Sequence, residues 1–523
     1  MEFCRRKWPW DPGVKPDSVV LIGLFPDKIA TYCNAHMAND LARRKGAGIE
    51  AFRITTRASP IVQKVYASCG ARVRLDASFA EGAEPKLRKT ADEMFAALES
   101  KWDLLELECD GIKIGDLVYD SFLRYYSEPT VILDDPRLRD IIFQTLLVYT
   151  ATTNYLKARN VIGFIADDYS YHENGTVTRV MMRANVPVYL ALFGPQYFIY
   201  RLSGEPETGG YNYPIRWPFH HFRKLFQALP AEEQIRCREK GRRHLDEKLA
   251  GKLDAFTLVN ITAYAKSEGK VFPGSGKPRV LVLMHDFFDS PHGYRWMLFP
   301  DFYEWCCFLF ERASETPFEW YVKPHPSAWD AKKGSLNESN RKIINELQTR
   351  FPKIRFLAPT VSNRAIVEEG ISAMFTMYGT AGHEFARMGI PVVNAGDNPH
   401  IAYEFNYHPR TIEEYADLIA RADRLPCSAD ADDIAEFVYM NYFYFAEHCS
   451  TGANPLSEEF FADPNYHELC TAPNGYDRLI AAGDDEWCEA KMNKYYDEFY
   501  RNDLSLPVPA WEPLLATAMD IKI

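Results

Sequence analysis

The sequence predicts an α/β protein with two doubly wound domains, and three observations support this prediction. Apolar runs typical of buried parallel strands recur along the chain, starting with SVVLIG at Ser18 to Gly23. Amphipathic or charged helical stretches alternate with these runs, which is the pattern of βαβ units. The chain has 523 residues, too many for one ordinary core, and this length suggests two domains of roughly 200 to 270 residues each.

The N-terminal half alternates as a parallel sheet requires. Its expected strands cover residues 18–26, 48–54, 161–168 and 187–193, and its expected helices cover residues 30–46, 84–100, 140–159 and 176–186. An aromatic and charged helical region follows, from Gly204 to Lys270. We expect residues 1–272 to form an N-terminal domain that carries this region as a helical insertion.

The second half repeats the alternation after a linker rich in Pro, Gly and Ser near Pro273 to Pro278. We expect residues 273–440 to form a second doubly wound domain and residues 441–523 to form C-terminal helices and a tail. The expected strands begin with RVLVLMH, FEWYVKPHP and IRFLAP, and the expected helices cover residues 303–314, 341–350 and 362–370.

Composition excludes several classes of protein. The net charge of -12 argues against nucleic-acid binding, which normally requires a basic surface. Eleven scattered cysteines without metal-ligand spacing predict reduced thiols in the cytoplasm. The first residues lack the apolar segment of a signal peptide, and no apolar run is long enough to span a bilayer. A basic run from Arg236 to Arg243 leaves peripheral association with anionic lipid open, although a solvated helix face is the other interpretation.

Four stretches at predicted strand ends carry candidate chemistry, because open α/β sheets bind ligands at those ends. The first, Ile371 to Gly396, predicts a strand, a small-residue turn, a helix from about His383 and another strand. Glycines let the backbone approach a ligand, and the start of a helix favours an anion. The candidate donor-binding residues here are Tyr378, Gly379, Thr380, Ala381, Gly382 and Glu384. The alternative is an ordinary turn in which Glu384 only complements the helix.

The second stretch is VKPHPSA, Val322 to Ala328. Lys323, His325 and Ser327 present a cation, an imidazole and a hydroxyl on a backbone stiffened by two prolines. Such groups suit a phosphate leaving group, because they stabilise charge that grows in the transition state. A proline-rich strand exit with an exposed histidine is the plainer interpretation.

The third stretch, Met284 to Trp305, contains His285, Asp286, Asp289 and His292. The spacing of these residues has no signature of a fixed metal site, so we expect no metal and favour a loop that contacts the donor sugar, with His285, Asp289 and His292 as candidates. A turn that caps a helix at Asp301 is the alternative.

The fourth stretch, Ile165 to Gly175, places Asp167 and Asp168 at the end of a buried strand. One of the two could take a proton from an acceptor hydroxyl as a general base. The alternative is that they cap the next helix or bind an arginine.

Taken together, HDFFDSPHGYRWMLFPDFYEW, VKPHPS, YGTAGHEFARMGIPVV and ADDYSYHENGTVTRVMMRANVPVY resemble bacterial surface-carbohydrate and capsule polysaccharide biosynthesis proteins, the group that includes the capsular Kdo transferases. The resemblance implies a GT-B glycosyltransferase: two Rossmann-like domains facing a central cleft, an acceptor on the N-terminal side, a nucleotide-sugar donor on the C-terminal side, and no cofactor or essential metal. It implies transfer to a glycan or glycolipid, with a Kdo-type sugar from CMP as one form.

The resemblance also implies roles for single residues. His325 would contact the donor phosphate with help from Ser327, Thr380 and the following amides would bind phosphate or a sugar carboxylate, and Glu384 would hold the ribose. Asp168 is preferred to Asp167 as the base. The group often has two serines where this chain has Tyr378 and Gly379, so the contacts to the donor sugar stay open.

Three other functions remain compatible with these residues. A CDP-alditol phosphotransferase would share the frame, but it would usually carry a Thr-Asp-Tyr-Ser-Ser turn that ISAMFTMYGTAG lacks. A nucleotide-sugar epimerase would need acids in the cleft but no acceptor. A non-catalytic nucleotide-sugar-binding subunit would need neither. The sequence does not determine the donor, the acceptor, the linkage, the stereochemical course or the oligomeric state.

Overall fold

The computed structural model describes most of the chain up to residue 447. The described residues are 17–23, 34–35, 38–39, 41–42, 45–52, 54, 66–67, 70–166, 168–192, 198–204, 210–215, 218–251, 270–294, 296–325, 335–444 and 447. They group into two compact units. The first holds the described residues up to Phe122 and those from Ile132 to Ile215, and the second holds Leu123–Val131 and those from Pro218 to Tyr444. The expected C-terminal tail lies outside the described residues.

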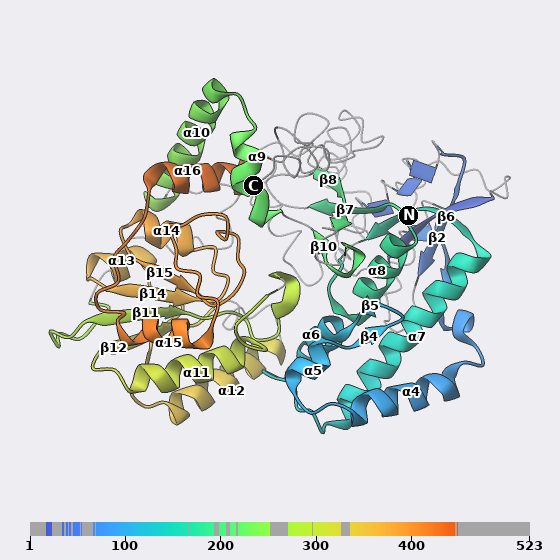
Figure 1. The fold of residues 1–523 in the computed structure, drawn as a ribbon, viewed down its shortest axis with the longest axis horizontal. Coiled ribbons are helices and arrows are strands. Elements are labelled where there is room, and N and C mark those ends of the chain that lie inside the picture. Colours follow the sequence, from blue (N-terminus) through green and yellow to red (C-terminus); the bar gives the residue numbers. More distant parts are fainter. Residues whose placement is uncertain are drawn as a thin grey trace, which may run out of the picture. The chain divides into compact units, whose positions relative to one another are not determined.

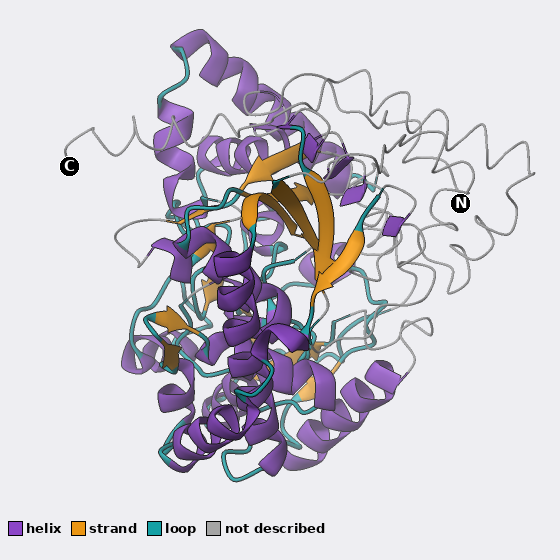
Figure 2. Ribbon diagram, turned by 90° about the vertical axis from the view of Figure 1, so that its right-hand side faces the viewer, coloured by secondary structure: helices purple, strands orange, loops and turns teal. Residues whose placement is uncertain are grey.

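The first unit is built on a six-stranded sheet with the strand order β3-β2-β1-β6-β7-β8. Its strands are β1 (Ser18–Gly23), β2 (Gly48–Phe52), β3 (Arg72–Leu75), β6 (Asn160–Ala166), β7 (Val188–Leu192) and β8 (Phe198–Arg201). Neighbours run parallel except β8, which is antiparallel to β7. The chain winds outward from β1 in both directions, as in a Rossmann-type sheet. Figure 2 shows these strands as a twisted set of arrows.

Helices pack against this sheet, and two short strand pairs lie outside it. The helices of this part of the chain are α4 (Glu84–Ala96), α5 (Lys101–Leu105), α6 (Gly115–Tyr126), α7 (Pro136–Ala158) and α8 (Thr176–Arg183). The strand pairs are β4 (Glu108–Cys109) with β5 (Ile112–Lys113), and β9 (Ser203–Gly204) with β10 (Pro214–Ile215). The carboxylate of Asp135 accepts a hydrogen bond from Arg137 N at 2.8 Å and so caps α7. Among the described helices, α7 included, none is both long and apolar enough to cross a membrane.

The second unit is built on a five-stranded parallel sheet with the order β13-β12-β11-β14-β15. Its strands are β11 (Arg279–Leu283), β12 (Glu319–Lys323), β13 (Arg355–Phe356), β14 (Ala373–Thr376) and β15 (Val392–Asn394). The central residues Val280, Leu281 and Val282 are fully buried, as a strand covered on both faces requires. Both predicted parallel sheets are therefore present.

Helices lie on both faces of the second sheet (Figure 1). One face carries α11 (Phe302–Ser314), α12 (Ser335–Arg350) and α15 (Ile412–Ala420), and the other carries α13 (Asn363–Glu368) and α14 (Gly382–Arg387). The indole N–H of Trp305 on α11 donates a 2.7 Å hydrogen bond to the hydroxyl of Tyr415 on α15, so two buried aromatic side chains join these helices.

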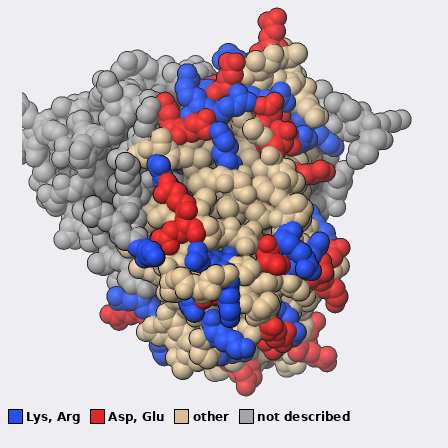
Figure 3. Space-filling model, turned by 90° about the vertical axis from the view of Figure 1, so that its left-hand side faces the viewer, with Lys and Arg blue, Asp and Glu red and all other residues tan. Residues whose placement is uncertain are grey.

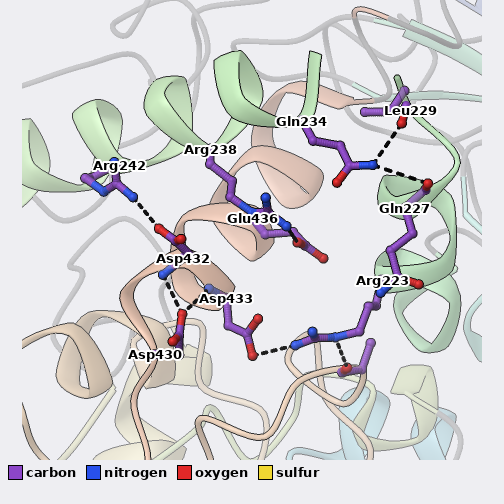
Figure 4. A network of polar contacts seen from close by, with 11 residues as sticks. Arg223, Gln227, Leu229, Gln234, Arg238, Arg242, Asp430, Asp432, Asp433 and Glu436 are labelled. Carbon is purple, nitrogen blue, oxygen red and sulfur yellow. Dashed lines mark hydrogen bonds and ion pairs between the residues drawn. The ribbon is translucent and has the colours of Figure 1, made fainter. Parts of the chain in front are cut away.

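A pair of helices packs beyond α14. Helix α10 (Ala231–Leu249) lies against α16 (Ala431–Tyr439), and α9 (Phe222–Gln227) packs on α16 as well. Three arginines, Arg223, Arg238 and Arg242, pair with Asp433, Glu436 and Asp432 of α16 at 2.5, 2.8 and 2.5 Å (Figure 4). Two arginines of the basic run in α10, Arg238 and Arg242, thus help to dock this helix on α16. The face in Figure 3 shows acidic and basic side chains interspersed rather than a surface of one sign.

The placement of α9 and α10 differs from the expected domain boundary at residue 273. These helices precede that boundary, yet they group with the second unit. The reason is a tertiary contact that local sequence does not reveal: a side chain at Gly241 of α10 would place its Cβ 2.1 Å from Ala435 O and 3.0 Å from Tyr439 N. The two helix backbones therefore touch, and only glycine permits this.

We predict that Gly241→Ala destabilises the second unit. The added methyl group would clash with the backbone of α16, and overpacking of this kind costs about 1–3 kcal/mol. Urea unfolding followed by far-UV circular dichroism would measure the change in the free energy of unfolding.

Gly274→Ala is the matched control, because no atom lies within 4 Å of the methyl group it would add. It should stay within about 0.5 kcal/mol of wild type. Equal stability of the two variants would show that the α10 and α16 backbones are not in contact.

Candidate functional site

The carboxyl ends of β11, β12 and β14 define the candidate site. Strand β11 pairs with β12 on one side and with β14 on the other. The chain winds in opposite directions from β11, so the junction of β11 and β14 is the topological switch point, where open α/β sheets bind ligands. His285 follows β11, Lys323 ends β12, and the turn from Tyr378 to Gly382 follows β14. Three of the predicted stretches thus meet at one edge of the sheet.

His285 holds the turn after β14 in place. Its Nε2 lies 3.2 Å from the hydroxyl oxygen of Thr376 and accepts a 3.1 Å hydrogen bond from the backbone N–H of Tyr378. The imidazole stacks on the ring of Phe302 at a centroid distance of 4.8 Å. An acceptor Nε2 requires the neutral tautomer with hydrogen on Nδ1. His285 therefore positions the turn through Nε2.

Burial explains why His285 stays neutral. Desolvation lowers the pKa of His285 to about 3, and the nearby charge of His325 lowers this pKa further while Asp286 opposes the shift. His325 follows β12, the strand beside β11, so it lies at the same edge of the sheet as His285. His325 is exposed, so its imidazole is accessible to a ligand at this edge.

The turn itself depends on two glycines. The N–H of Gly379 donates a 3.2 Å hydrogen bond to the Thr376 hydroxyl, and a Cβ at Gly379 would lie 2.6 Å from that oxygen. A Cβ at Gly382 would lie 2.8 Å from the side chains of Asn406 and His400. Larger residues would push the turn outward at either position.

The remaining residues of the turn differ in exposure. Thr380 is exposed, Ala381 is half-buried, and Tyr378 is buried with its hydroxyl donating to Pro291 O. Helix α14 has six residues, fewer than its predicted role as an anion site would favour. The chemistry of this site consequently depends more on side chains than on the helix.

Lys323 supplies a buried cation at the end of β12. Its ammonium donates a 2.6 Å hydrogen bond to Asn363 Oδ1, at the start of α13. Burial lowers the pKa of Lys323 to about 8, and the carboxylate of Glu384 limits this fall. The ammonium is therefore mostly charged at neutral pH, and it lies close enough to Glu384 to feel its charge.

Glu384 is already engaged within the protein. Its Oε1 lies 2.6 Å from the ammonium of Lys248, near the end of α10, and both side chains are nearly buried. The carboxylate that we predicted to hold a ribose thus pairs with an internal cation. Nothing in the local sequence around Lys248 indicated this contact.

Three further candidates lie on the loop after β11. Asp286 accepts hydrogen bonds from Phe288 N and from Asn340 Nδ2 at 3.2 and 3.1 Å. Its carboxylate therefore stabilises the conformation of the loop. Asp289 is exposed and His292 is half-buried, both further along the same loop. Within the described residues, no group of three or more His, Cys, Asp and Glu side chains could hold a metal ion.

Asp168 lies at the end of β6 in the first unit. Its Oδ1 accepts hydrogen bonds from the backbone N–H groups of Tyr169 and Ser170 at 2.7 and 2.9 Å, so the carboxylate closes the turn that follows the strand. It does not cap the next helix, as the alternative to catalysis had it, because Tyr171–Gly175 begins after Ser170 and has no side-chain cap. Asp167 and Ser327 lie outside the described residues.

The structure adds His172 and Glu173, which sequence reasoning had read as part of a polar turn. Residues Tyr171–Gly175 form a π-helix, and Tyr171 has a positive φ of 59°, which is rare for a bulky residue. His172 and Glu173 are both buried, at 1% and 2% exposure. The polar letters of YHENG carry no local signal of that burial.

Tertiary hydrogen bonds account for these buried groups. Glu173 accepts a 2.7 Å hydrogen bond from Ile54 N, and His172 N donates a 2.7 Å hydrogen bond to Ser121 Oγ. The Ser121 hydroxyl hydrogen goes to Leu117 O at 2.6 Å, so the 3.3 Å contact with His172 Nδ1 requires a hydrogen on Nδ1. Burial lowers the pKa of His172 to about 4 against the charge of Glu173, which keeps the ring neutral.

Comparisons with known proteins add a weak likeness of fold. No protein-family model and no curated protein sequence matches the chain. Among solved structures, the chain is similar to the KpsC beta Kdo 2,4 transferase of Thermosulfurimonas dismutans, with 12% identity over 54% of this chain and 80% of that chain, at a TM-score of 0.33. It is also similar to UDP-GlcNAc 2-epimerase from Neisseria meningitidis bound to UDP-GlcNAc, with 10% identity over 89% and 98% of the chains, at a TM-score of 0.19.

A third solved structure is Anabaena HepE in complex with UDP and glucose, with 10% identity over 81% of this chain and 93% of that chain, at a TM-score of 0.24. TM-scores this low carry no argument about function. The function is therefore argued from the residues of the site.

We predict that Glu384→Ala strongly destabilises the protein, because it leaves the ammonium of Lys248 buried without its carboxylate partner. Breaking a buried ion pair from one side costs about 3–5 kcal/mol. The double variant Lys248→Met, Glu384→Gln should recover most of this loss. Chemical unfolding of Lys248→Met, Glu384→Gln and their double variant would measure the coupling energy between the two side chains.

A second ion pair between the same helices provides the control. Arg387 and Asp246 also join α14 to α10, at 3.0 Å, but both side chains are more than a third exposed. Asp246→Ala should change the free energy of unfolding by no more than about 1 kcal/mol. Additive effects of Lys248→Met and Glu384→Gln would contradict a buried pair.

Proposed function

We propose that the protein is a glycosyltransferase that moves a sugar from a nucleotide-sugar donor to a surface glycan or glycolipid. The observation that supports this most is the convergence of His285, His325, Lys323 and Glu384 on the switch point of the second sheet. The sequence resemblance of these stretches to capsule polysaccharide biosynthesis proteins favours a Kdo-type sugar carried by CMP as the specific donor.

The donor would lie across the ends of β12 and β14. Lys323 would offset the charge of the phosphates, and exposed His325 would contact the leaving phosphate with Ser327. Thr380 and the amides of Ala381 and Gly382 would bind the phosphate or a sugar carboxylate. With cationic side chains in these positions, charge that develops on the leaving group is stabilised without a metal.

Glu384 would bind the ribose while its carboxylate keeps the contact to Lys248. A carboxylate can accept at both oxygens, and Lys248 is 2.6 Å from Oε1. The contact to Lys248 orients the carboxylate before the nucleotide arrives, which reduces the entropy lost on binding.

Asp168 would act as the general base toward the acceptor hydroxyl, with Asp167 as its neighbour. This role rests on the GT-B arrangement that the resemblance implies. The backbone N–H groups that hold Oδ1 would fix the direction of the carboxylate. We propose association with the cytoplasmic face of a membrane only through the acceptor.

The function predicts that one nucleotide stabilises the protein. In a thermal-shift screen with CMP, UDP, GDP and CDP, a ligand at a hundredfold its dissociation constant adds about 2.7 kcal/mol to the free energy of unfolding. Once the nucleotide is known, the matching nucleotide sugar should be consumed in the presence of acceptor, with EDTA causing no loss.

The Asp168→Asn variant separates binding from catalysis in the same assay. It should bind the nucleotide as tightly as wild type and lose turnover. No response to any of the four nucleotides would refute the transferase function, and normal turnover by Asp168→Asn would remove Asp168 as the base.

The pKa of Lys323 predicts how nucleotide affinity depends on pH. Burial lowers this pKa to about 8, so the ammonium is charged below that pH and loses its proton above it. A bound phosphate favours the charged form, so affinity should fall by up to about tenfold per pH unit above pH 8.

Isothermal titration calorimetry of the identified nucleotide between pH 7 and 10 would measure this fall. Lys323→Met should bind more weakly at pH 7 and show a much smaller dependence above pH 8. The same slope in both proteins would mean that Lys323 does not contact the phosphate.

A further inference from the structure

The loop between β11 and α11 crosses the carboxyl edge of the second sheet and carries an exposed tryptophan. After His285, the backbone carbonyl of Pro291 in this loop accepts a hydrogen bond from the Tyr378 hydroxyl. Further along the loop, Met297 pairs with Gly396 in an antiparallel bridge. Gly396 follows β15, the strand beside β14. The loop therefore leads from the turn after β14 to the end of the neighbouring strand, about one strand spacing of 4.8 Å away.

Trp296 lies at the far end of this path. Its backbone carbonyl accepts a 2.8 Å hydrogen bond from Asp397 N, while the residue keeps 36% of its surface exposed. Trp305 and Trp320 are buried and fill the core of this unit, whereas Trp296 does not belong to that core.

A guanidinium lies over the Trp296 ring. The Cζ of Arg410 is 4.7 Å from the ring centroid, within the range of a cation–π contact. Arg410 donates to Asp397 Oδ1 at 2.7 Å, and His220 Nε2 lies 3.1 Å from Asp397 Oδ2. One carboxylate, itself only 7% exposed, thus orients both neighbours.

Asp397 contacts both members of the Trp296–Arg410 pair. Asp397 holds the backbone of Trp296 through its N–H and holds the guanidinium above the indole through its carboxylate. The pKa of Asp397 is lowered although burial alone would raise it, because His220 and Arg410 favour the ionised carboxylate. The ring and the cation are therefore fixed before any ligand binds, while the Arg410 side chain remains half exposed.

We propose that Trp296 and Arg410, held by Asp397, form the surface on which the nucleobase of the donor stacks. This inference rests on the proposed function, because it places the base of the same nucleotide whose phosphates would lie at Lys323 and Thr380. A planar heteroaromatic ring fits the pair because it can stack on the indole or on the flat guanidinium. The base would then extend along the edge from β14 toward β15.

The stacking proposal distinguishes a nucleobase from the other ring that could lie here, a sugar. A sugar ring packs its C–H face on an indole, so its affinity would depend on Trp296 whether or not a base is attached. Nucleoside phosphates and ribose 5-phosphate, which lacks a base, therefore separate the two.

The test measures dissociation constants of CMP, UDP, GDP, CDP and ribose 5-phosphate for three variants. Trp296→Ala should weaken the preferred nucleotide by about tenfold or more and leave ribose 5-phosphate unchanged. Trp296→Phe keeps a stacking ring and should recover most of the affinity. Trp102→Ala removes a more exposed tryptophan, 48% exposed in the first unit, and should behave as wild type.

The outcomes test the stacking surface separately from the proposed function. Binding of a nucleotide by wild type that Trp296→Ala leaves unchanged would overturn the stacking surface and keep the proposed function. An equal loss for ribose 5-phosphate would also overturn it, in favour of a sugar. If wild type bound none of the nucleotides, the proposed function and the stacking surface would both fail.

Discussion

The hydrogen-bonded pairing of β11 with both β12 and β14 is the constraint on which the candidate site depends. Val280 of β11 lies opposite Trp320 on one side and Ala373 on the other, in a fully parallel register. Because parallel strands end at the same edge, every residue that follows them is delivered to one place. Loops that differ widely in sequence position then meet without any special affinity for one another.

Two kinds of polar contact act at this edge, and they differ in charge. Around the turn after β14 the contacts are neutral: His285, the Thr376 hydroxyl and backbone N–H groups hold one another. Toward β12 and α10 they are ionic, with Glu384 between Lys248 and Lys323. The neutral contacts fix geometry at any ordinary pH, whereas the ionic ones respond to ligands and protons. A site that combines the two is rigid in shape but adjustable in charge.

The sequence predicted what local patterns can encode. Runs such as RVLVL give a buried strand, and glycines at Gly379 and Gly382 give a tight turn, so both sheets and that turn were foreseeable. The contact of Lys248 with Glu384 was not, because 136 residues separate them and the helix surface of α10 looks merely charged. The same limit applies to His172 and Glu173, whose burial is determined by Ser121 and Ile54 rather than by their neighbours in sequence.

At Gly241 the backbone of α10 touches the backbone of α16 at Ala435 and Tyr439, so any tilt of α10 would turn about this contact. Lys248 lies seven residues further along the helix, about 10 Å at a rise of 1.5 Å per residue. A tilt of about 5° around this point would move Lys248 by roughly 1 Å, enough to lengthen a hydrogen bond beyond its useful range. The position of Lys248 beside Glu384 therefore depends in part on the close contact at Gly241, about two turns away on the same helix.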